Sequence, residues 1–246
     1  MIKYKSINYI HFTSIPSTSS WTKEHSSLLD PHKLTCITAE EQTAGRGTFS
    51  KKWISPKGLN IYATLYFTLP KGYPFLQNLG QLLSISCCKC VEKMEFHPQI
   101  KWPNDLLLEG KKFAGILCEA TSCKEETGIA LGLGLNVNMP TEMTKKIDQP
   151  ATSLMEISQK IWNTEELLHK ILTTFLEDLD TLSSKGFAAF SLYYNNHIAF
   201  KGQSLQIKDG IASRTGICKG ISPEGSLLLT LPSGEEIKIS SGKIET

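Results

Sequence analysis

Apolar residues recur along the chain with two different periods. Asn60–Leu69 alternates strictly between apolar and polar side chains, which predicts a half-buried strand, and the apolar segment Leu34–Ala39 predicts a short buried strand before it. Further strands are predicted at residues 99–103, 104–108, 111–121 and 127–138. A short turn containing glycine joins the second and third of these into a hairpin. We expect these strands to form one mixed sheet.

Helical spacing of apolar residues occurs between these strands. Ser19 and Ser20 are good N-cap residues for an early helix, and residues 75–94 have apolar positions that fit one helix face. The clearest helix follows Asn163, which fits a capping box with Glu166. Its apolar stripe is expected to face the core and consists of Leu167, Leu168, Ile171, Leu172, Phe175, Leu176, Leu179 and Leu182.

The pattern changes after Asn195. Short strands separated by the tight turns SPEG and PSG follow at regular spacing, which is typical of a small β-barrel. We therefore expect two domains, residues 1–196 and 197–246, and an α+β fold in which helices pack on the mixed sheet of the first domain. Residues 141–160 give weak signals and are predicted to be a loop with a short helix.

Composition and charge exclude several classes of protein. The 246 residues are 40% hydrophobic and 20% charged, as in an ordinary globular chain, and the net charge of +2 argues against nucleic acid as the main partner. No apolar run can span a bilayer, and the first 14 residues lack the apolar core of a signal peptide. The seven cysteines are an odd number, Cys87, Cys88 and Cys90 cluster in a predicted helix, and no histidine lies nearby at zinc-finger spacing, which predicts free thiols, a cytoplasmic location and no structural metal.

A loop rich in glycine and basic residues follows the first predicted strand, in the segment AEEQTAGRGTFSKKWISPKG. Gly45 and Gly47 let the backbone approach a ligand closely, and Arg46 between them can bind a carboxylate or phosphate through two N–H groups. Lys51 adds positive charge, and Trp53 offers a face on which a base can stack. Taken alone, the segment fits a phosphate-binding loop and a solvated surface turn equally well.

The segment KWPNDLLLEGKKFAGILCEA places polar residues at the ends of two strands. Pro103 ends the first strand, so Asn104 and Asp105 lie at a corner. Lys112 begins the next strand, and Gly115 beside it can admit a ligand. Solvated lysines and Asn-Asp turns are also common without any function.

Two glycines interrupt the predicted strand GLGLNVN. Gly132 and Gly134 are two residues apart, so they face the same side of the strand as Asn136 and leave a floor without side chains. Taken alone, this pattern favours glycines that only serve sheet packing.

Together, the segments EEQTAGRG…W, KWPNDLLLEGKKFAGILCE and GLGLNVN, in this order and spacing, resemble biotin protein ligases. PSTSS at residues 16–20 resembles the serine-threonine-asparagine signature of that family, with Ser19 in place of asparagine, and PATSL at residues 150–154 also fits. The resemblance covers roughly the whole chain. It implies a catalytic fold of the class II synthetase and biotin/lipoate ligase type with an SH3-like barrel after it. We expect the short form, without the N-terminal DNA-binding domain of repressor-type members.

The resemblance implies a two-step reaction with biotin, ATP and Mg²⁺. Biotin would be activated to biotinyl-5′-AMP with release of pyrophosphate, and would then pass to one lysine of a biotin carboxyl carrier domain such as that of acetyl-CoA carboxylase. The first step brings a carboxylate against a phosphate, so it needs fixed positive charge.

Roles for individual residues follow from the same resemblance. Lys112 and Arg46 would neutralise charge, and Asp105 would meet the acceptor amine, either to position it or as general base. The residues matching biotin-binding positions are Ser17, Thr18, Gln42, Gly45, Arg46, Lys112, Gly115, Gly132 and Gly134. Those matching nucleotide-binding positions are Lys51, Trp53, Lys101, Asn104 and Asn136, with Mg²⁺ near Asn104 and Asp105.

One position departs from the family pattern. Biotin protein ligases usually carry another arginine directly after the second glycine of the loop, where this chain has Thr48. In the family that arginine helps to retain the adenylate. We therefore expect a site that releases the adenylate more readily or forms it more slowly, unless Lys51 or Lys52 compensates.

Three alternatives remain open at this point. A lipoate or octanoate ligase or transferase would share the fold, although its longer arginine- and glycine-rich signature is not found here. A non-catalytic biotin sensor would explain Thr48, but Lys112, Asp105 and Asn136 are all present. A DNA-binding repressor fits least, because the charge is balanced. We expect neither a nucleic-acid nor a membrane partner, and a monomer or a homodimer.

Overall fold

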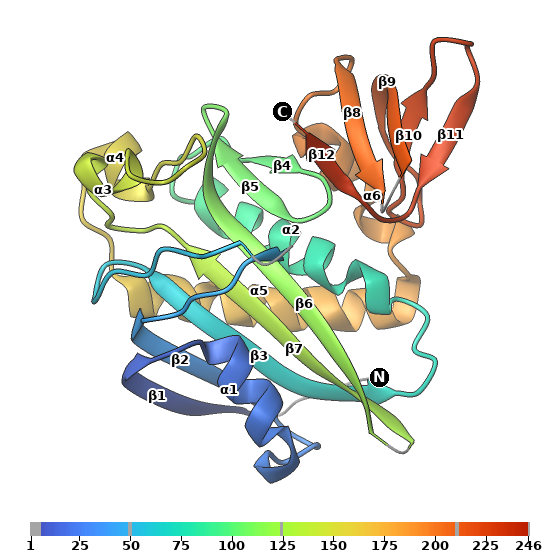
Figure 1. The fold of residues 1–246 in the computed structure, drawn as a ribbon. Helices are drawn as coiled ribbons and strands as arrows, with labels where there is room; N and C mark the ends of the chain where they lie inside the picture. The colour runs from blue at the N-terminus through green and yellow to red at the C-terminus, as the bar shows by residue number, and fades with distance from the viewer. Residues whose placement is uncertain (1–5, 49–50, 124, 210–211, 246) are drawn as a thin grey trace.

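Seven strands form a mixed sheet in the order β1-β2-β3-β7-β6-β5-β4 (Figure 1). The protein is represented by a computed structural model, which describes residues 6–48, 51–123, 125–209 and 212–245. β1 runs parallel to β2, and every other neighbouring pair in this sheet is antiparallel. The strands are β1 (Ile7–Ile15), β2 (Leu34–Gln42), β3 (Ile61–Pro70), β4 (Gln99–Lys101), β5 (Asp105–Leu108), β6 (Lys111–Cys123) and β7 (Glu126–Leu135).

Helices cover both faces of this sheet (Figure 1). α2 and α5 pack on one face, where Phe67 of β3 contacts Phe175 of α5 with ring centroids 6.2 Å apart. α1 packs on the opposite face, where Ser19 contacts Thr64. The helices are α1 (Thr18–His25), α2 (Leu79–Glu92), α3 (Thr141–Thr144), α4 (Leu154–Ser158), α5 (Thr164–Lys185) and α6 (Ala188–His197).

The prediction that β3 is half-buried was wrong. Its polar positions are as inaccessible as its apolar ones, with Tyr62 and Thr64 exposed by 2% and 0%. α1 covers Thr64, and the Tyr62 hydroxyl donates to the carbonyl of Pro56 in the preceding loop. The strand alternates between apolar and polar residues, yet both of its faces are buried, because a helix and a loop cover the polar face.

Several local predictions need correction at the ends of elements. The N-cap of α1 is Ser17, whose Oγ accepts from the Ser20 N–H, rather than Ser19 or Ser20. The predicted N-cap at Asn163 was confirmed, since its side chain accepts from the Glu166 N–H, while the Glu166 carboxylate pairs with Lys170. Residues 141–160 contain two short helices, α3 and α4, instead of one. The sequence reasoning missed β1 and α6 altogether.

The end of the chain forms a second, five-stranded antiparallel sheet in the order β11-β10-β9-β8-β12, compatible with an SH3-like barrel (Figure 1). Its strands are β8 (Ser204–Asp209), β9 (Ala212–Ile221), β10 (Leu227–Thr230), β11 (Glu236–Ile239) and β12 (Lys243–Glu245). We call this the C-terminal sheet. Its apolar side chains belong to the same buried cluster as those of the first sheet. The division into domains at residue 197 stays a prediction.

Two properties of the described residues bear on the class of protein. No helix among them is long and apolar enough to cross a bilayer. Six cysteines in this part of the chain carry free thiols. Burial raises the pKa of Cys36 to about 12, which keeps that thiol protonated and unreactive.

Candidate functional site

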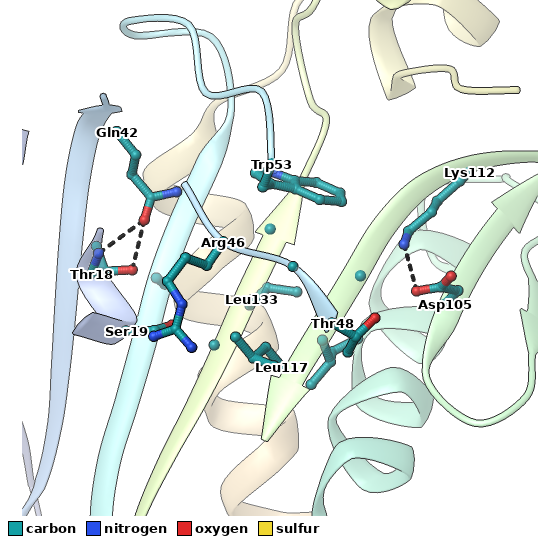
Figure 2. Close-up of a pocket in the computed structure, with 16 residues that line it drawn as sticks. Thr18, Ser19, Gln42, Arg46, Thr48, Trp53, Asp105, Lys112, Leu117 and Leu133 are labelled. Carbon is teal, nitrogen blue, oxygen red and sulfur yellow. Dashed lines mark hydrogen bonds and ion pairs between the residues drawn. The ribbon is translucent and has the colours of Figure 1, made fainter. Parts of the chain in front are cut away.

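A pocket opens on the face of the first sheet that also carries α1 (Figure 2). The empty space between its lining residues is about 440 Å³, a figure that includes open solvent at its mouth. Its walls come from α1, the end of β2 and the loop after it, and strands β3, β5, β6 and β7. The predicted site residues that line it are Thr18, Gln42, Arg46, Trp53, Asp105, Lys112, Gly115, Gly132 and Gly134. We call it the first pocket.

One end of the first pocket carries a hydrogen-bonded group of uncharged polar side chains beside Arg46 (Figure 2). Gln42 Oε1 accepts from the Thr18 N–H at 2.9 Å and from the Thr18 hydroxyl at 3.1 Å, and Gln42 Nε2 donates to Ser55 Oγ at 3.0 Å. Thr64 Oγ1 joins this group by donating to Thr18 Oγ1 and contacting Ser19 Oγ. Hydroxyl and amide groups without charge suit a neutral ligand that carries both donors and acceptors.

The floor of the first pocket is made by the two glycines of β7. A Cβ at Gly132 would lie 2.8 Å from Ser19 Oγ, and one at Gly134 would lie 2.6 Å from Trp53 Nε1. Both glycines therefore face the pocket, as the sequence predicted. The floor is bare because the side chains above it, Ser19 and Trp53, need that space.

The other end of the first pocket holds an ion pair. Lys112 Nζ lies 2.6 Å from Asp105 Oδ1, and the two side chains are exposed by 15% and 30%. A Cβ at Gly115 would lie 3.1 Å from the amine and 3.3 Å from the carboxylate, so this glycine makes room for the pair. The Lys112 backbone is fixed by bonds with Pro150 and Thr152, at 2.9 and 3.0 Å. Lys112 is therefore held at its backbone and at its amine.

Arg46 lies on the opposite side of the first pocket from Lys112 (Figure 2). Its guanidinium donates to Ser20 Oγ at 3.2 Å and to Glu119 Oε1 at 3.0 Å, and Lys23 reaches the same carboxylate oxygen at 2.8 Å. Burial opposes ionisation of Glu119, yet bonds from Lys23 and Arg46 bring the pKa of its carboxyl below the usual value. Glu119 therefore holds Arg46 at the pocket wall.

The loop that carries Arg46 is closed by backbone hydrogen bonds. The Trp53 N–H donates to Gly45 at 2.9 Å, and the Gly47 N–H donates to Lys51 at 2.7 Å. A Cβ at Gly45 would overlap the Trp53 carbonyl and lie 2.7 Å from Ser55 Oγ. Gly45 is thus required for the close approach of the two arms of the loop.

A second pocket lies beyond Trp53 and Lys112, which line both. Lys51 and Asn136 line it as well. The Asn136 Nδ2 donates to the Thr152 carbonyl, while its buried Oδ1 and the buried Trp53 Nε1 have no hydrogen-bond partner in the described structure. Unpaired buried polar atoms beside a cavity are groups that a ligand can satisfy.

Four predicted site residues line neither pocket in the described part of the chain: Ser17, Gly45, Lys101 and Asn104. The Ser17 side chain caps α1, and the Asn104 amide donates to the Ile116 carbonyl at 2.7 Å. Burial lowers the pKa of the Lys101 amine, Asp105 opposes this, and nearby Lys112, Lys243 and Lys51 add to the lowering. Lys101 thus belongs to a group of positive charges around Asp105.

Sequence reasoning missed other parts of the site. Residues 146–151 form one wall of the second pocket, and Ala151 makes a β-bridge with Lys112. The segment PATSL was the available signal for this wall. Glu119 was quoted within the ligase-like segment without a role, although it binds Arg46. Among the described residues, no group of three or more His, Cys, Asp or Glu side chains could hold a metal ion.

Comparisons with known proteins fit this geometry. Residues 11–136 match the biotin/lipoate A/B protein ligase family. Among curated proteins, the bifunctional ligase/repressor BirA of Bacillus subtilis is 30% identical over 217 residues, with 86% of this chain and 66% of that protein covered. The biotin--[acetyl-CoA-carboxylase] ligase of Paracoccus denitrificans is 28% identical, with 82% and 86% covered.

The solved structures include a near neighbour. Biotin protein ligase from Aquifex aeolicus in complex with biotin and ATP superposes with a TM-score of 0.81 at 30% identity, and 97% of each chain is covered. By contrast, this chain spans 66% of the Bacillus subtilis protein and 60% of BirA from Escherichia coli.

Proposed function

The chain belongs to the biotin/lipoate A/B protein ligase family, and we propose that it is an ATP-dependent biotin protein ligase. It activates biotin to biotinyl-5′-AMP with release of pyrophosphate, then transfers biotin to a lysine of a biotin carboxyl carrier domain. One observation carries this proposal: the ion-paired Lys112 lies between the first pocket, whose far end carries the uncharged polar group of Thr18 and Gln42, and a second pocket with basic and unpaired polar groups. Such a lysine can meet a carboxylate from one side and a phosphate from the other.

In this proposal biotin occupies the first pocket. Thr18 and Gln42 face its neutral ureido ring, with Gly132 and Gly134 as the floor. Ser17 supports this end from outside the pocket as the cap of α1. The remaining proposed biotin residues are Gly45, Arg46, Lys112 and Gly115, which shape the loop and the carboxylate end.

ATP occupies the second pocket and its basic surroundings. Trp53 and Asn136 lie beside the base, and Lys51 and Lys101 near the phosphates. Asn104 donates to Ile116 through Nδ2 and Asp105 pairs with Lys112 through Oδ1, so the amide oxygen of the first and the second carboxylate oxygen of the other are the atoms that could hold Mg²⁺. When bound together with the triphosphate, Mg²⁺ would neutralise phosphate charge.

Two bond exchanges complete the reaction. A biotin carboxylate oxygen attacks the α-phosphorus, and the bond to the bridging oxygen breaks so that its electron pair leaves with pyrophosphate. The acceptor amine, after losing a proton, attacks the acyl carbon, and AMP leaves with the electron pair of the broken C–O bond. Lys112 and Arg46 stabilise the first transition state, and Asp105 receives the amine in the second.

Pyrophosphate release by the native chain tests the proposed function. With ATP, Mg²⁺ and biotin we expect release, followed by transfer of labelled biotin to a carrier-domain peptide. Lipoate and octanoate serve as rival substrates. Release with lipoate in preference to biotin would establish the related ligase instead, and biotin binding without release would establish a sensor. We propose a cytoplasmic location, where ATP and carrier domains meet.

Replacing Thr48 with arginine is expected to slow the release of biotinyl-AMP several-fold. Thr48 lines the first pocket, and a guanidinium there would bind phosphate oxygens through two N–H groups. Release is measured by rapid filtration after one turnover. Thr48→Lys is the control, because it adds a positive charge without the planar guanidinium that can donate two N–H groups at once. Equal release by the native chain and Thr48→Arg would show that Thr48 does not weaken adenylate retention.

Replacing Gly134 with alanine is expected to weaken binding of both biotin and ATP about tenfold. The new Cβ would displace the Trp53 ring, which lines both pockets. The matched variant Gly132→Ala would meet only Ser19 and β6, and should weaken biotin alone. Calorimetry with each ligand separately makes the comparison. Unchanged ATP binding by Gly134→Ala would contradict a nucleotide role for Trp53.

A further inference from the structure

The corner between β4 and β5 carries Asp105 and is held by residues far away in the sequence. Trp102 is 2% exposed, and its indole N–H donates to the Gly225 carbonyl at 3.1 Å. The Pro103 carbonyl accepts from the hydroxyl of Tyr194 in α6 at 2.9 Å. Asn104 is bonded twice to Ile116 of β6, as acceptor at 3.2 Å and as donor at 2.7 Å. Every residue of the corner before Asp105 is therefore fixed.

Gly225 lies in the turn between β9 and β10 of the C-terminal sheet, and this turn is inserted at the start of α2. The Gly225 carbonyl also accepts from Gln81 Nε2 at 2.7 Å, and the Glu224 carbonyl accepts from Asn78 Nδ2 at 2.9 Å. All three donors are buried side chains. Buried polar side chains that bond one turn fix its position, since losing any bond leaves a buried group unpaired.

The turn itself cannot carry a side chain at Gly225. Its φ is +90°, and an added Cβ would overlap Gln81 Oε1 and lie 2.6 Å from Asn78 Nδ2. The turn is closed by its own bonds between Ser222, Gly225 and Ser226. Glycine is thus required both for the backbone conformation and for the contact with α2.

We propose that the β9–β10 turn is a positioning element for Asp105 and Lys112, acting through the Gly225 carbonyl and Trp102. Asp105 follows the fixed corner directly and bonds Lys112 at 2.6 Å, so a shift of Trp102 moves the ion pair relative to the first pocket. The C-terminal sheet then contributes to adenylation without touching substrate. This inference rests on the proposed ligase function and extends it to a residue that lies outside both pockets in the described structure.

Gly225→Ala tests the proposal against a closely matched control. Gly234, in the turn between β10 and β11, has φ +88°, but an added Cβ there would meet nothing within 4 Å. Both substitutions bring the same backbone strain, and only one disturbs the corner. We expect Gly225→Ala to lower the kcat of adenylate formation roughly tenfold with a nearly unchanged KM for biotin, because small misplacement of catalytic groups lowers the rate. Gly234→Ala should keep the native kcat.

A second variant removes the bond with less disturbance. Trp102→Phe keeps a buried ring but deletes the N–H that reaches Gly225. We expect a several-fold lower kcat, again with little change in KM for biotin. If the turn merely stabilised the fold, its loss would lower the apparent kcat only by lowering the amount of active protein. Gly225→Ala and Gly234→Ala would then show equal apparent kcat at a matched loss of thermal stability.

Amide hydrogen exchange measures the stability of the corner between β4 and β5 independently of catalysis. The Ile116 N–H donates to the Asn104 carbonyl, so its exchange should be faster in Gly225→Ala than in Gly234→Ala. Equal exchange, or faster exchange with native kcat, would overturn the proposal. A native chain that releases no pyrophosphate would overturn the proposed function, and the exchange result would still decide whether the turn positions the corner.

Discussion

Replacing Lys112 with alanine is expected to lower the rate of adenylate formation by on the order of 10²–10³-fold, the effect of removing one preorganised charge from a transition state. The Lys112 side chain is 15% exposed and its amine is fixed by Asp105 at 2.6 Å, so it needs little reorganisation to face developing charge. Two anions must come together in this step, and Lys112 is the basic residue that lines both pockets in the described structure. Loss of its charge leaves their repulsion uncompensated.

The neighbouring residue supplies the control. Lys111 is exposed, and its side chain points to the other side of the strand, so Lys111→Ala removes the same charge from the chain without emptying the site. We measure pyrophosphate release in a single turnover with saturating biotin and ATP. Native rates for Lys112→Ala would exclude this lysine from the chemistry. An equal loss of rate in Lys111→Ala would mean that the two lysines act only through the overall electrostatic field of the protein.

The residues that sequence reasoning placed well are those fixed by local periodicity. Gly132 and Gly134 had to share one face because strand side chains alternate, and the corner at Pro103 had to precede the hairpin that carries Lys112. Trp53 was assigned to the nucleotide by resemblance, and the structure places it between the two pockets, above Gly134. Short-range rules were enough for the two glycines and the corner, whereas Trp53 needed the resemblance to a family.

The residues that it missed depend on pairing between distant segments. Arg46 binds Glu119, which is 73 positions away, and no local pattern links them. β1 has a mixed burial pattern and pairs on one side only, as an edge strand, so its sequence carries little alternation. The biotin role that resemblance gives to Ser17 stays a prediction; in the structure its hydroxyl caps α1, because the extended backbone at that position exposes the helix N–H groups to it.

Replacing Asp105 with asparagine is expected to separate the two steps of the reaction. Asparagine has nearly the same shape but no charge, so Lys112 keeps its position approximately and loses the anion that offsets its charge. Adenylate formation should persist, since an unpaired lysine attracts phosphate at least as strongly. Transfer to the acceptor lysine should fall on the order of 10²-fold, because no carboxylate remains to receive and orient the amine.

Rapid quenching of one turnover, with adenylate and biotinylated peptide counted separately, distinguishes the steps. Asp148 also lines the second pocket and forms no ion pair in the described structure, so Asp148→Asn is the control for loss of a nearby negative charge. Accumulated adenylate with slow transfer in Asp105→Asn alone would establish Asp105 as the residue that meets the acceptor. Equal losses in both steps would mean that Asp105 acts only by holding Lys112.

A higher pH distinguishes the two possible roles of Asp105 in transfer, which are removing the proton of the acceptor amine and orienting that amine. If Asp105 removes the proton, raising the pH toward the ordinary amine value of about 10.4 should restore transfer, whereas a purely orienting carboxylate leaves the defect in place.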